Sequence, residues 1–230
     1  FVATLPDGKR VAVDASRFCS MHNGEIGAIR YAITPLNFSA AATLVLDVDA
    51  DVVNKDSNYD EKFWNEVSQQ ADSSLAMVTA ETRKTLFHVT TGMTWQLEQG
   101  GKKVDVSPKV ISRNKYAGHE LAVSLRENEP LVIVKYAAVL SSENHPKATL
   151  EQAARQQLEG ARAQGFDNLL KAHAAVWAHK WEECDITIDG DVAAQQGIRF
   201  NIFQLMQTYT GDDERLNIGP KGFTGEKYGG

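Results

Sequence analysis

The chain has 230 residues, of which 43% are hydrophobic and 23% are charged, a composition typical of a soluble globular protein. Its formal net charge of −6 disfavours a nucleic-acid partner, which would need a basic stripe, and its apolar runs are too short to span a membrane. We therefore expect neither nucleic acid nor a membrane among its partners.

Residues 1–145 have the pattern of an antiparallel β-sandwich. The run FVATLPDGKRVAVDA predicts a hairpin, because Pro6-Asp7-Gly8 is a turn tripeptide between two β-rich segments. Apolar residues alternate with polar or small ones in GAIRYAITPL and ATLVLDVDADV, as in strands with one buried face. Further short runs follow: SLAMVTAE, TLFHVTTGMTWQLE, KKVDVS, HELAVSLREN and PLVIVKYAAVLSS. Since no helix-length pattern separates most of them, a parallel α/β sheet is disfavoured.

The segment 54–73 interrupts this pattern. It reads NKDSNYDEKFWNEVSQQADS, is largely polar, and carries Phe63 and Trp64. We expect a long excursion from the sandwich that is in part helical. Long loops of this kind often carry binding contacts.

The hydrophobic period becomes helical in residues 146–184. Thr149 and Gln152 have the spacing of a capping box ahead of LEQAARQQLEGARAQ, and Gly165 is placed to end that helix. Asp167 can cap a second helix, NLLKAHAAVWAHKWEEC. Its apolar stripe consists of Leu170, Ala174, Trp177 and Trp181. Such a stripe is more often a packing surface than a ligand platform, so this segment is predicted to be a helical linker.

Residues 185–230 predict a strand, a helix and a loop-like end. The strand is expected around Ile186 and Ile188, and the helix in DVAAQQGIRFNIFQLMQTY. The apolar stripe of the helix is wide and comprises Ile198, Phe200, Ile202, Phe203, Leu205, Met206 and Tyr209. Because so wide an arc needs neighbours on more than one side, we expect a helical domain that is cut off after its first helix.

The two cysteines and six histidines form no metal or redox motif. Cys19 and Cys184 are far apart and make no C-x-x-C pattern, so we expect two free thiols in a reducing, cytoplasmic environment. His173 and His179 would lie about 240° apart on a helix and could not share a metal. We therefore expect no metal site and structural roles for the histidines.

The most specific pattern lies at the end of the chain. Residues 193–230, AAQQGIRFNIFQLMQTYTGDDERLNIGPKGFTGEKYGG, resemble the beginning of the catalytic domain of glycoside hydrolase family 65. The preceding AHAAVWAHKWEECDITIDGD resembles that family's linker helix, and NKDSNYDEKFW resembles its N-terminal sandwich. Within the family, the likeness is to the inverting disaccharide phosphorylases, above all those that act on maltose.

This resemblance implies a fold made of three parts. The family joins an N-terminal β-sandwich through a helical linker to an (α/α)6 barrel. The chain is then expected to hold the sandwich in residues 1–145, the linker in residues 146–184 and a truncated start of the barrel in residues 185–230. A homodimer is also implied.

The resemblance implies a reaction as well, namely phosphorolysis of an α-glucosidic disaccharide with inversion. From maltose it gives β-glucose 1-phosphate and glucose. Inorganic phosphate is the co-substrate and no cofactor is needed. The family's general acid is a glutamate implied to lie beyond residue 230. No catalytic residue is therefore assigned here, and the fragment alone is expected to be inactive.

The glycine-rich run NIGPKGFTGEKYGG is implied to form part of the active-site wall. Its glycines allow the backbone to approach a sugar ring closely. The side chains that could contact substrate are Lys221, Phe223, Thr224, Glu226, Lys227 and Tyr228. The two lysines could raise the positive potential around a phosphate, and the two aromatic rings could stack on a pyranose. Equally, Glu226 and Lys227 could pair with each other, and Phe223 could belong to the core.

Other functions stay open. A kojibiose, trehalose or nigerose phosphorylase, or a hydrolase of the same family that uses water, fits the pattern too, since the residues that would decide are implied to lie elsewhere. A non-catalytic β-sandwich module for carbohydrate binding or oligomerisation is an alternative of another class. It is disfavoured by the apolar helix that such a module would leave exposed.

Overall fold

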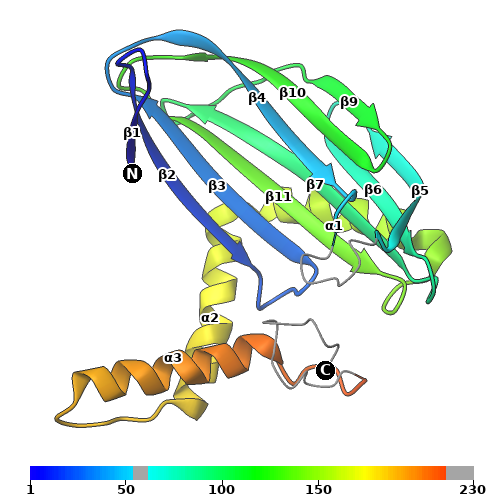
Figure 1. The fold of residues 1–230 in the computed structure, drawn as a ribbon, viewed down its shortest axis with the longest axis vertical. Helices are drawn as coiled ribbons and strands as arrows, with labels where there is room; N and C mark the ends of the chain where they lie inside the picture. The colour runs from blue at the N-terminus through cyan, green and yellow to red at the C-terminus, as the bar shows by residue number, and fades with distance from the viewer. Residues whose placement is uncertain (54–61, 216–230) are drawn as a thin grey trace. The chain divides into compact units, whose positions relative to one another are not determined.

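The computed structural model describes residues 1–53 and 62–215. Within them the chain folds into two antiparallel sheets followed by three α-helices (Figure 1). It divides into two compact units, the first of residues 1–52 and 62–173 and the second, among the described residues, of Val53 and residues 174–215. The boundary between the units falls within helix α2, Phe166–Cys184.

The larger sheet runs in the order β1-β2-β3-β11-β7-β6-β5, and the short β8 pairs with β7. All of these pairs are antiparallel. The strands are β1 (Val2–Thr4), β2 (Arg10–Cys19), β3 (Ile26–Pro35), β5 (Trp64–Ala71), β6 (Leu75–Thr82), β7 (His88–Gln99), β8 (Lys102–Lys103) and β11 (Leu131–Ser141). The hairpin predicted at the start of the chain is confirmed: Leu5 and Lys9 close the turn, and Gly8 has a φ of +82°.

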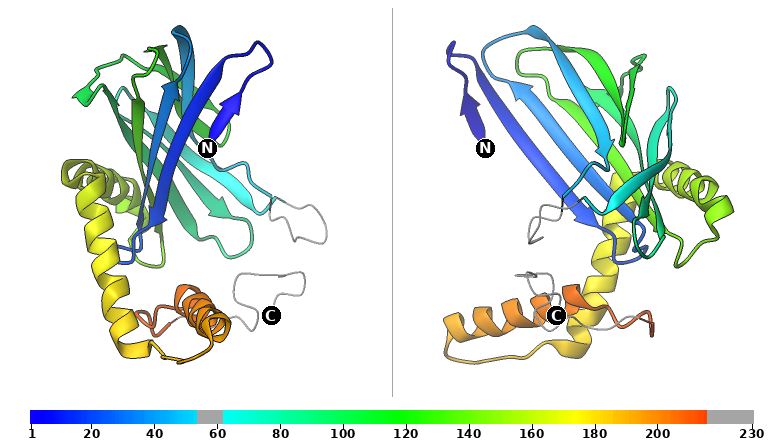
Figure 2. Two further views of the ribbon diagram at one scale, coloured as in Figure 1. Left: turned by 90° about the vertical axis from the view of Figure 1, so that its left-hand side faces the viewer. Right: turned by 45° about the vertical axis from the view of Figure 1, so that its right-hand side comes forward.

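A smaller sheet packs on the inner face of the larger one, so the prediction of an antiparallel sandwich for residues 1–145 is confirmed (Figure 2). Its order is β4-β10-β9, with bounds Ala40–Asp49 for β4, Tyr116–Leu125 for β10 and Lys109–Arg113 for β9. The alternation of buried and outward-facing side chains that the sequence predicts for the strands is present on β7. On β7, Met93, Trp95 and Leu97 point into the layer between the sheets.

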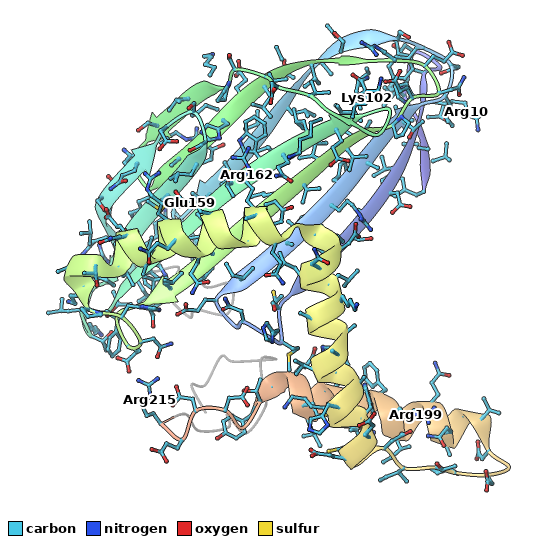
Figure 3. The ribbon with its side chains drawn as sticks, turned by 180° about the vertical axis from the view of Figure 1, so that it is seen from behind. Arg10, Lys102, Glu159, Arg162, Arg199 and Arg215 are labelled. Atoms are coloured by element: carbon cyan, nitrogen blue, oxygen red, sulfur yellow. The ribbon has the colours of Figure 1, made fainter. Side chains whose placement is uncertain are left out.

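The outer face of the larger sheet is covered by helix α1, Leu150–Gln164, as Figures 1 and 3 show. A short 3₁₀ turn, Lys147–Thr149, leads into it. The helix buries one stripe of side chains, Leu150, Ala154, Leu158 and Ala161. They pack on residues of β6 and β11, among them Met77 and Tyr136. Because both faces of the larger sheet are covered, β6 is a nearly continuous apolar run rather than an alternating one.

Gly92 of β7 lies directly beneath α1. A Cβ atom at this position would come within 2.9 Å of the Leu158 Cδ1 atom and within 2.9 Å of the Met77 Cγ atom. Both neighbouring side chains are buried. The missing side chain therefore sets how closely the helix approaches the sheet.

The expectation of helix in the segment 54–73 is wrong where the structure describes that segment. Residues 54–61 lie outside the described residues, and Trp64–Ala71 form the edge strand β5, with a bulge between Glu66 and Ser68. Its polar side chains have partners: Glu66 accepts a hydrogen bond from the Lys115 amide, and Ser68 donates to Glu151 of α1. Polar residues in this strand bind neighbouring elements, which a sequence pattern cannot distinguish from a solvated loop.

Two expected helix caps are also wrong. The Thr149 hydroxyl donates to the Pro146 carbonyl at 3.3 Å and caps no amide of α1, because a 3₁₀ turn already precedes the helix. The Asp167 carboxylate instead accepts a hydrogen bond from the Arg30 guanidinium of β3 at 2.7 Å. The expectation for Gly165 is confirmed, since it follows the last residue of α1 with a φ of +80°.

The second unit contains the rest of α2 and helix α3, Val192–Thr208. The strand expected around Ile186 and Ile188 is absent from the described residues. The Gln195 side chain occupies the place of a partner strand there, donating to the Ile186 carbonyl at 2.8 Å and accepting from the Ile188 amide at 2.7 Å. Asp191 caps α3 by accepting from the Ala194 amide at 2.9 Å.

Two further expectations can be compared with the described residues. Cys19 and Cys184 are both free thiols. No helix among residues 1–53 and 62–215 combines the length and apolar character needed to cross a membrane.

We predict that Gly92→Ala lowers the free energy of unfolding by about 1–3 kcal/mol, because the added methyl group overpacks the contact between α1 and β7. Chemical denaturation of the variant and the parent measures the difference. Gly24→Ala is the matched control, since a Cβ atom at Gly24 meets nothing within 4 Å. Equal stability of the Gly92→Ala variant and the parent would show that α1 can shift without cost.

Candidate functional site

The side chains proposed from the sequence for the active-site wall cannot be placed. Lys221, Phe223, Thr224, Glu226, Lys227 and Tyr228 all lie outside the described residues. The hypothesis that they contact substrate stays a prediction. The described residues contain a different polar cavity, in the first unit.

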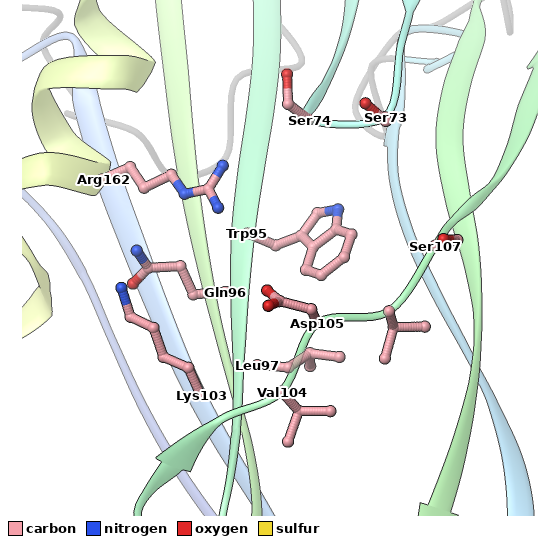
Figure 4. A pocket seen from close by; sticks show the side chains of 11 residues that line it. Ser73, Ser74, Trp95, Gln96, Leu97, Lys103, Val104, Asp105, Ser107 and Arg162 are labelled. Atoms are coloured by element: carbon pink, nitrogen blue, oxygen red, sulfur yellow. The ribbon is translucent and has the colours of Figure 1, made fainter.

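This cavity, which we call the Trp95 pocket, has a volume of about 280 Å³ (Figure 4). Its polar and aromatic lining includes Ser73, Trp95, Gln96, Lys103, Asp105 and Arg162. The strand ladder explains its position. On the edge of β7 that does not pair with β11, pairing with β6 ends at Thr94 and pairing with β8 begins at Glu98. The pocket opens at the stretch of β7 between these two ladders.

The floor of the pocket is held by a buried chain of hydrogen bonds. The Trp95 indole nitrogen donates to the His119 Nδ1 atom at 2.8 Å, and the His119 Nε2 atom lies 2.7 Å from the Asp72 carbonyl oxygen. The imidazole therefore accepts at Nδ1 and donates at Nε2, which is the neutral form. Burial lowers the pKa of His119, outweighing the raising effect of its bond to Asp72. Trp95 is consequently fixed in one orientation.

Asp72 also shapes the rim of the pocket. Its carboxylate accepts hydrogen bonds from the Ser74 amide and hydroxyl, both at 2.7 Å, and from the Leu75 amide at 3.1 Å. Arg155 of α1 pairs with the same carboxylate at 3.3 Å. Burial raises the pKa of the Asp72 carboxyl, but these donors outweigh it and hold the pKa at about 2. The carboxylate therefore holds its own turn, residues 72–75, and ties it to α1 through charge-assisted bonds, while the Thr94 hydroxyl of β7 donates to the Ser74 carbonyl at 2.7 Å.

Three charged side chains at the pocket have no ion pair or hydrogen bond within the described part of the chain: Lys103, Asp105 and Arg162. They come from different elements, β8, the extended segment after it, and the last turn of α1. Gln96 accepts a hydrogen bond from the Tyr136 hydroxyl at 3.3 Å. In Figure 4, Arg162, Gln96 and Lys103 lie on one side of β7, and Trp95 lies on the other.

Sequence reasoning missed this pocket. The alternation in TWQLEQGGKK could have placed Trp95 inside the sandwich, with Gly100-Gly101 as the turn to β8. The approach of Arg162 depends on how α1 packs, which is a tertiary property. No group of three or more His, Cys, Asp or Glu side chains within residues 1–53 and 62–215 is arranged to hold a metal ion.

Comparison with protein families places two matches along the chain. The sequence model described as the N-terminal domain of glycosyl hydrolase family 65 matches residues 1–180. The model of the central catalytic domain of the same family matches residues 199–230. The first match contains the whole sandwich and the Trp95 pocket.

Individual relatives agree with these matches. The chain is 37% identical over 227 residues to the maltose phosphorylase of Bacillus subtilis (strain 168), covering 96% of this chain and 29% of that protein. It is 29% identical to a kojibiose phosphorylase of Caldanaerobacter subterraneus, covering 97% of this chain and 30% of that protein. It is 26% identical to an α,α-trehalose phosphorylase of Thermoanaerobacter brockii, covering 98% of this chain and 30% of that protein. The chain thus spans less than a third of the length of these relatives.

A solved structure shows the same fold. It comes from the human microbiome and is described as a candidate kojibiose phosphorylase. It superposes with a TM-score of 0.84 at 23% identity, covering 96% of this chain and 28% of that chain.

We predict that Asp72→Asn destabilises the protein at neutral pH by about 1 kcal/mol, a value reduced for the partial exposure of the carboxylate. The folded pKa of about 2 lies below the ordinary 3.8, so the charge stabilises the fold above about pH 4. This contribution is lost as the pH falls toward 2, and the variant and the parent should then converge. Denaturation at several pH values tests this, with Asp105→Asn as the control expected to change nothing. A constant gap down to pH 2 would contradict it.

Proposed function

The chain belongs to glycosyl hydrolase family 65, and from this premise we propose that the whole protein is a phosphorylase that uses inorganic phosphate to cleave an α-glucosidic disaccharide reversibly. We propose maltose as the substrate. The observation that carries this choice is the 37% identity to a maltose phosphorylase, against 29% and 26% for the kojibiose and trehalose phosphorylases. The match of the catalytic-domain model to residues 199–230 supports an enzyme over a non-catalytic module.

The proposed reaction inverts the anomeric carbon. A carboxylic acid protonates the departing glycosidic oxygen while a phosphate oxygen attacks the anomeric carbon from the opposite face. The bond between this carbon and the glycosidic oxygen breaks, so maltose and phosphate give glucose and β-glucose 1-phosphate. Phosphate is itself the nucleophile, and no second carboxylate is required to activate water. By resemblance, the general acid is a glutamate of the whole protein outside residues 1–230.

We further propose that residues 146–184 link the sandwich to an (α/α)6 barrel that begins in residues 185–230. The exposure of α3 supports this: Phe200 is 60% exposed and Leu205 is 72% exposed, and no residue of this helix is buried among the described residues. Apolar side chains at this exposure are suited to packing against further helices. In this arrangement the candidates from Lys221 to Tyr228 belong to the wall of the barrel's active site.

The remaining alternatives differ in substrate or nucleophile. In the first group, the whole protein is a phosphorylase that acts on kojibiose, trehalose or nigerose in place of maltose. In the second, it is a hydrolase, in which water replaces phosphate as the nucleophile. A homodimer is part of the proposal and rests on the resemblance alone. A cytoplasmic location is also proposed, and it rests on the two unpaired cysteines.

We predict that the full-length protein releases glucose from maltose only when phosphate is present. The other product should be the β anomer of glucose 1-phosphate, which proton and phosphorus NMR identify directly. Parallel assays with kojibiose, trehalose and nigerose measure specificity and should give lower kcat/KM values. Glucose release without phosphate would assign a hydrolase, and the α anomer would exclude the inverting mechanism.

We predict that residues 1–230 alone release no glucose 1-phosphate from maltose and phosphate, because the proposed general acid lies outside them. The full-length protein under the same conditions is the positive control. Phosphate-dependent turnover by the 230-residue chain would mean that a carboxylic acid within it does the chemistry.

A further inference from the structure

The Trp95 pocket carries charges of both signs that do not neutralise each other. Asp105 can only accept hydrogen bonds, whereas Lys103 and Arg162 can only donate them. None of the three makes an ion pair with another described residue. Gln96 adds an amide whose nitrogen can donate while its oxygen is held by Tyr136. The pocket therefore presents separated donors and acceptors around one cavity (Figure 4).

This combination suits neither a simple ion nor an apolar molecule. An anion would pair with Lys103 and Arg162 but would lie beside the like charge of Asp105, and a cation would pair with Asp105 but would face the two basic side chains. An apolar ligand would strip water from these charges without replacing it, which costs free energy. A neutral ligand with several hydroxyl groups avoids all three costs, because each hydroxyl both donates and accepts.

The floor adds an apolar surface to these polar groups. Trp95 is only 8% exposed, and its indole nitrogen is already used by His119, so what remains at the cavity is carbon surface. The hydroxyls of Ser73 and Ser74 stand at the rim, with Ser74 fixed by Asp72. An apolar surface with the serine hydroxyls and Asp105 beside it, and basic groups on the other side of β7, matches a sugar ring, which has apolar carbon–hydrogen faces and a polar edge.

Size limits the ligand further. Pockets for drug-sized ligands measure roughly 300–1,000 Å³. A volume of about 280 Å³ falls just below that range and suits one or two sugar units.

We propose that the Trp95 pocket binds a neutral saccharide of one or two units. The pocket is built entirely from the first compact unit. It is thus a binding site additional to the active site proposed above. Its occupation requires no catalysis, and it can be tested whether or not the proposed reaction is correct.

The test is a titration of the 230-residue chain with glucose and with maltose, followed by calorimetry and by saturation-transfer NMR. We expect one of them to bind with a Kd on the order of 1 mM. Asp105→Ala and Arg162→Ala should each weaken binding about tenfold, since each removes a hydrogen bond to a charged group. Lys103→Ala should weaken it as well.

Matched controls separate the pocket from general charge effects. Lys102→Ala removes a neighbouring lysine that does not line the pocket, and Arg17→Ala removes an exposed arginine of β2. Both should bind as the parent does, and circular dichroism should show that every variant is folded. Three outcomes would overturn the proposal: no binding of either neutral sugar, binding unaffected by the Asp105 and Arg162 variants, or tighter binding of glucose 1-phosphate or inorganic phosphate than of the neutral sugars.

Discussion

The close packing of α1 on the larger sheet is the contact on which the first unit depends. Gly92 permits it, because any side chain there would collide with Leu158 and Met77. Without this helix, the outer face of the sheet would expose Tyr136 and its apolar neighbours to water. Burying the two leucines of the helix stripe stabilises the fold by about 1.5–3 kcal/mol each. The same docking places Glu151 against β5 and β6 and Arg162 at the Trp95 pocket. The absence of a side chain at Gly92 therefore influences both the core and the pocket.

A second link crosses the sandwich from sheet to sheet. His119 lies on β10 of the smaller sheet and is 0% exposed, so both of its ring nitrogens need partners. Trp95 of the larger sheet satisfies one and the Asp72 carbonyl satisfies the other. A half-satisfied imidazole in this position would be costly, which ties the orientation of Trp95 to the spacing of the two sheets. These two hydrogen bonds hold the floor of the pocket in one orientation, and a preorganised floor lowers the entropic cost of binding.

The parts of the fold that follow local rules were predictable from the sequence. Alternation identified the strands on either side of the Pro6-Asp7-Gly8 turn, and helical periodicity with Gly165 identified α1 and its end. The errors arose where a distant partner decided the outcome. Asp167 pairs with Arg30 of β3 rather than capping its own helix. On the polar edge strand β5, Gln70 donates a hydrogen bond to Glu151 of α1. The proposed wall residues rest on resemblance, whereas the Trp95 pocket arises from three segments far apart in sequence and has no local signal.

The two units are stabilised by different kinds of interaction. For this reason the proposal for α3 and the proposal for the Trp95 pocket rest on different kinds of support. The first unit has buried clusters on both faces of its larger sheet. In the second, the described contacts are local or exposed: the Asp191 cap, the Arg199–Asp185 pair at 2.6 Å and the Trp177–Phe203 rings with centroids 5.2 Å apart. A helix cap and an aromatic pair contribute about 0.5–1.5 kcal/mol each, whereas a solvent-exposed ion pair contributes little. Local signals are sufficient to specify α3 as a helix, but they do not specify what it packs against. For α3, family membership therefore carries the functional proposal, whereas for the Trp95 pocket the geometry itself carries it.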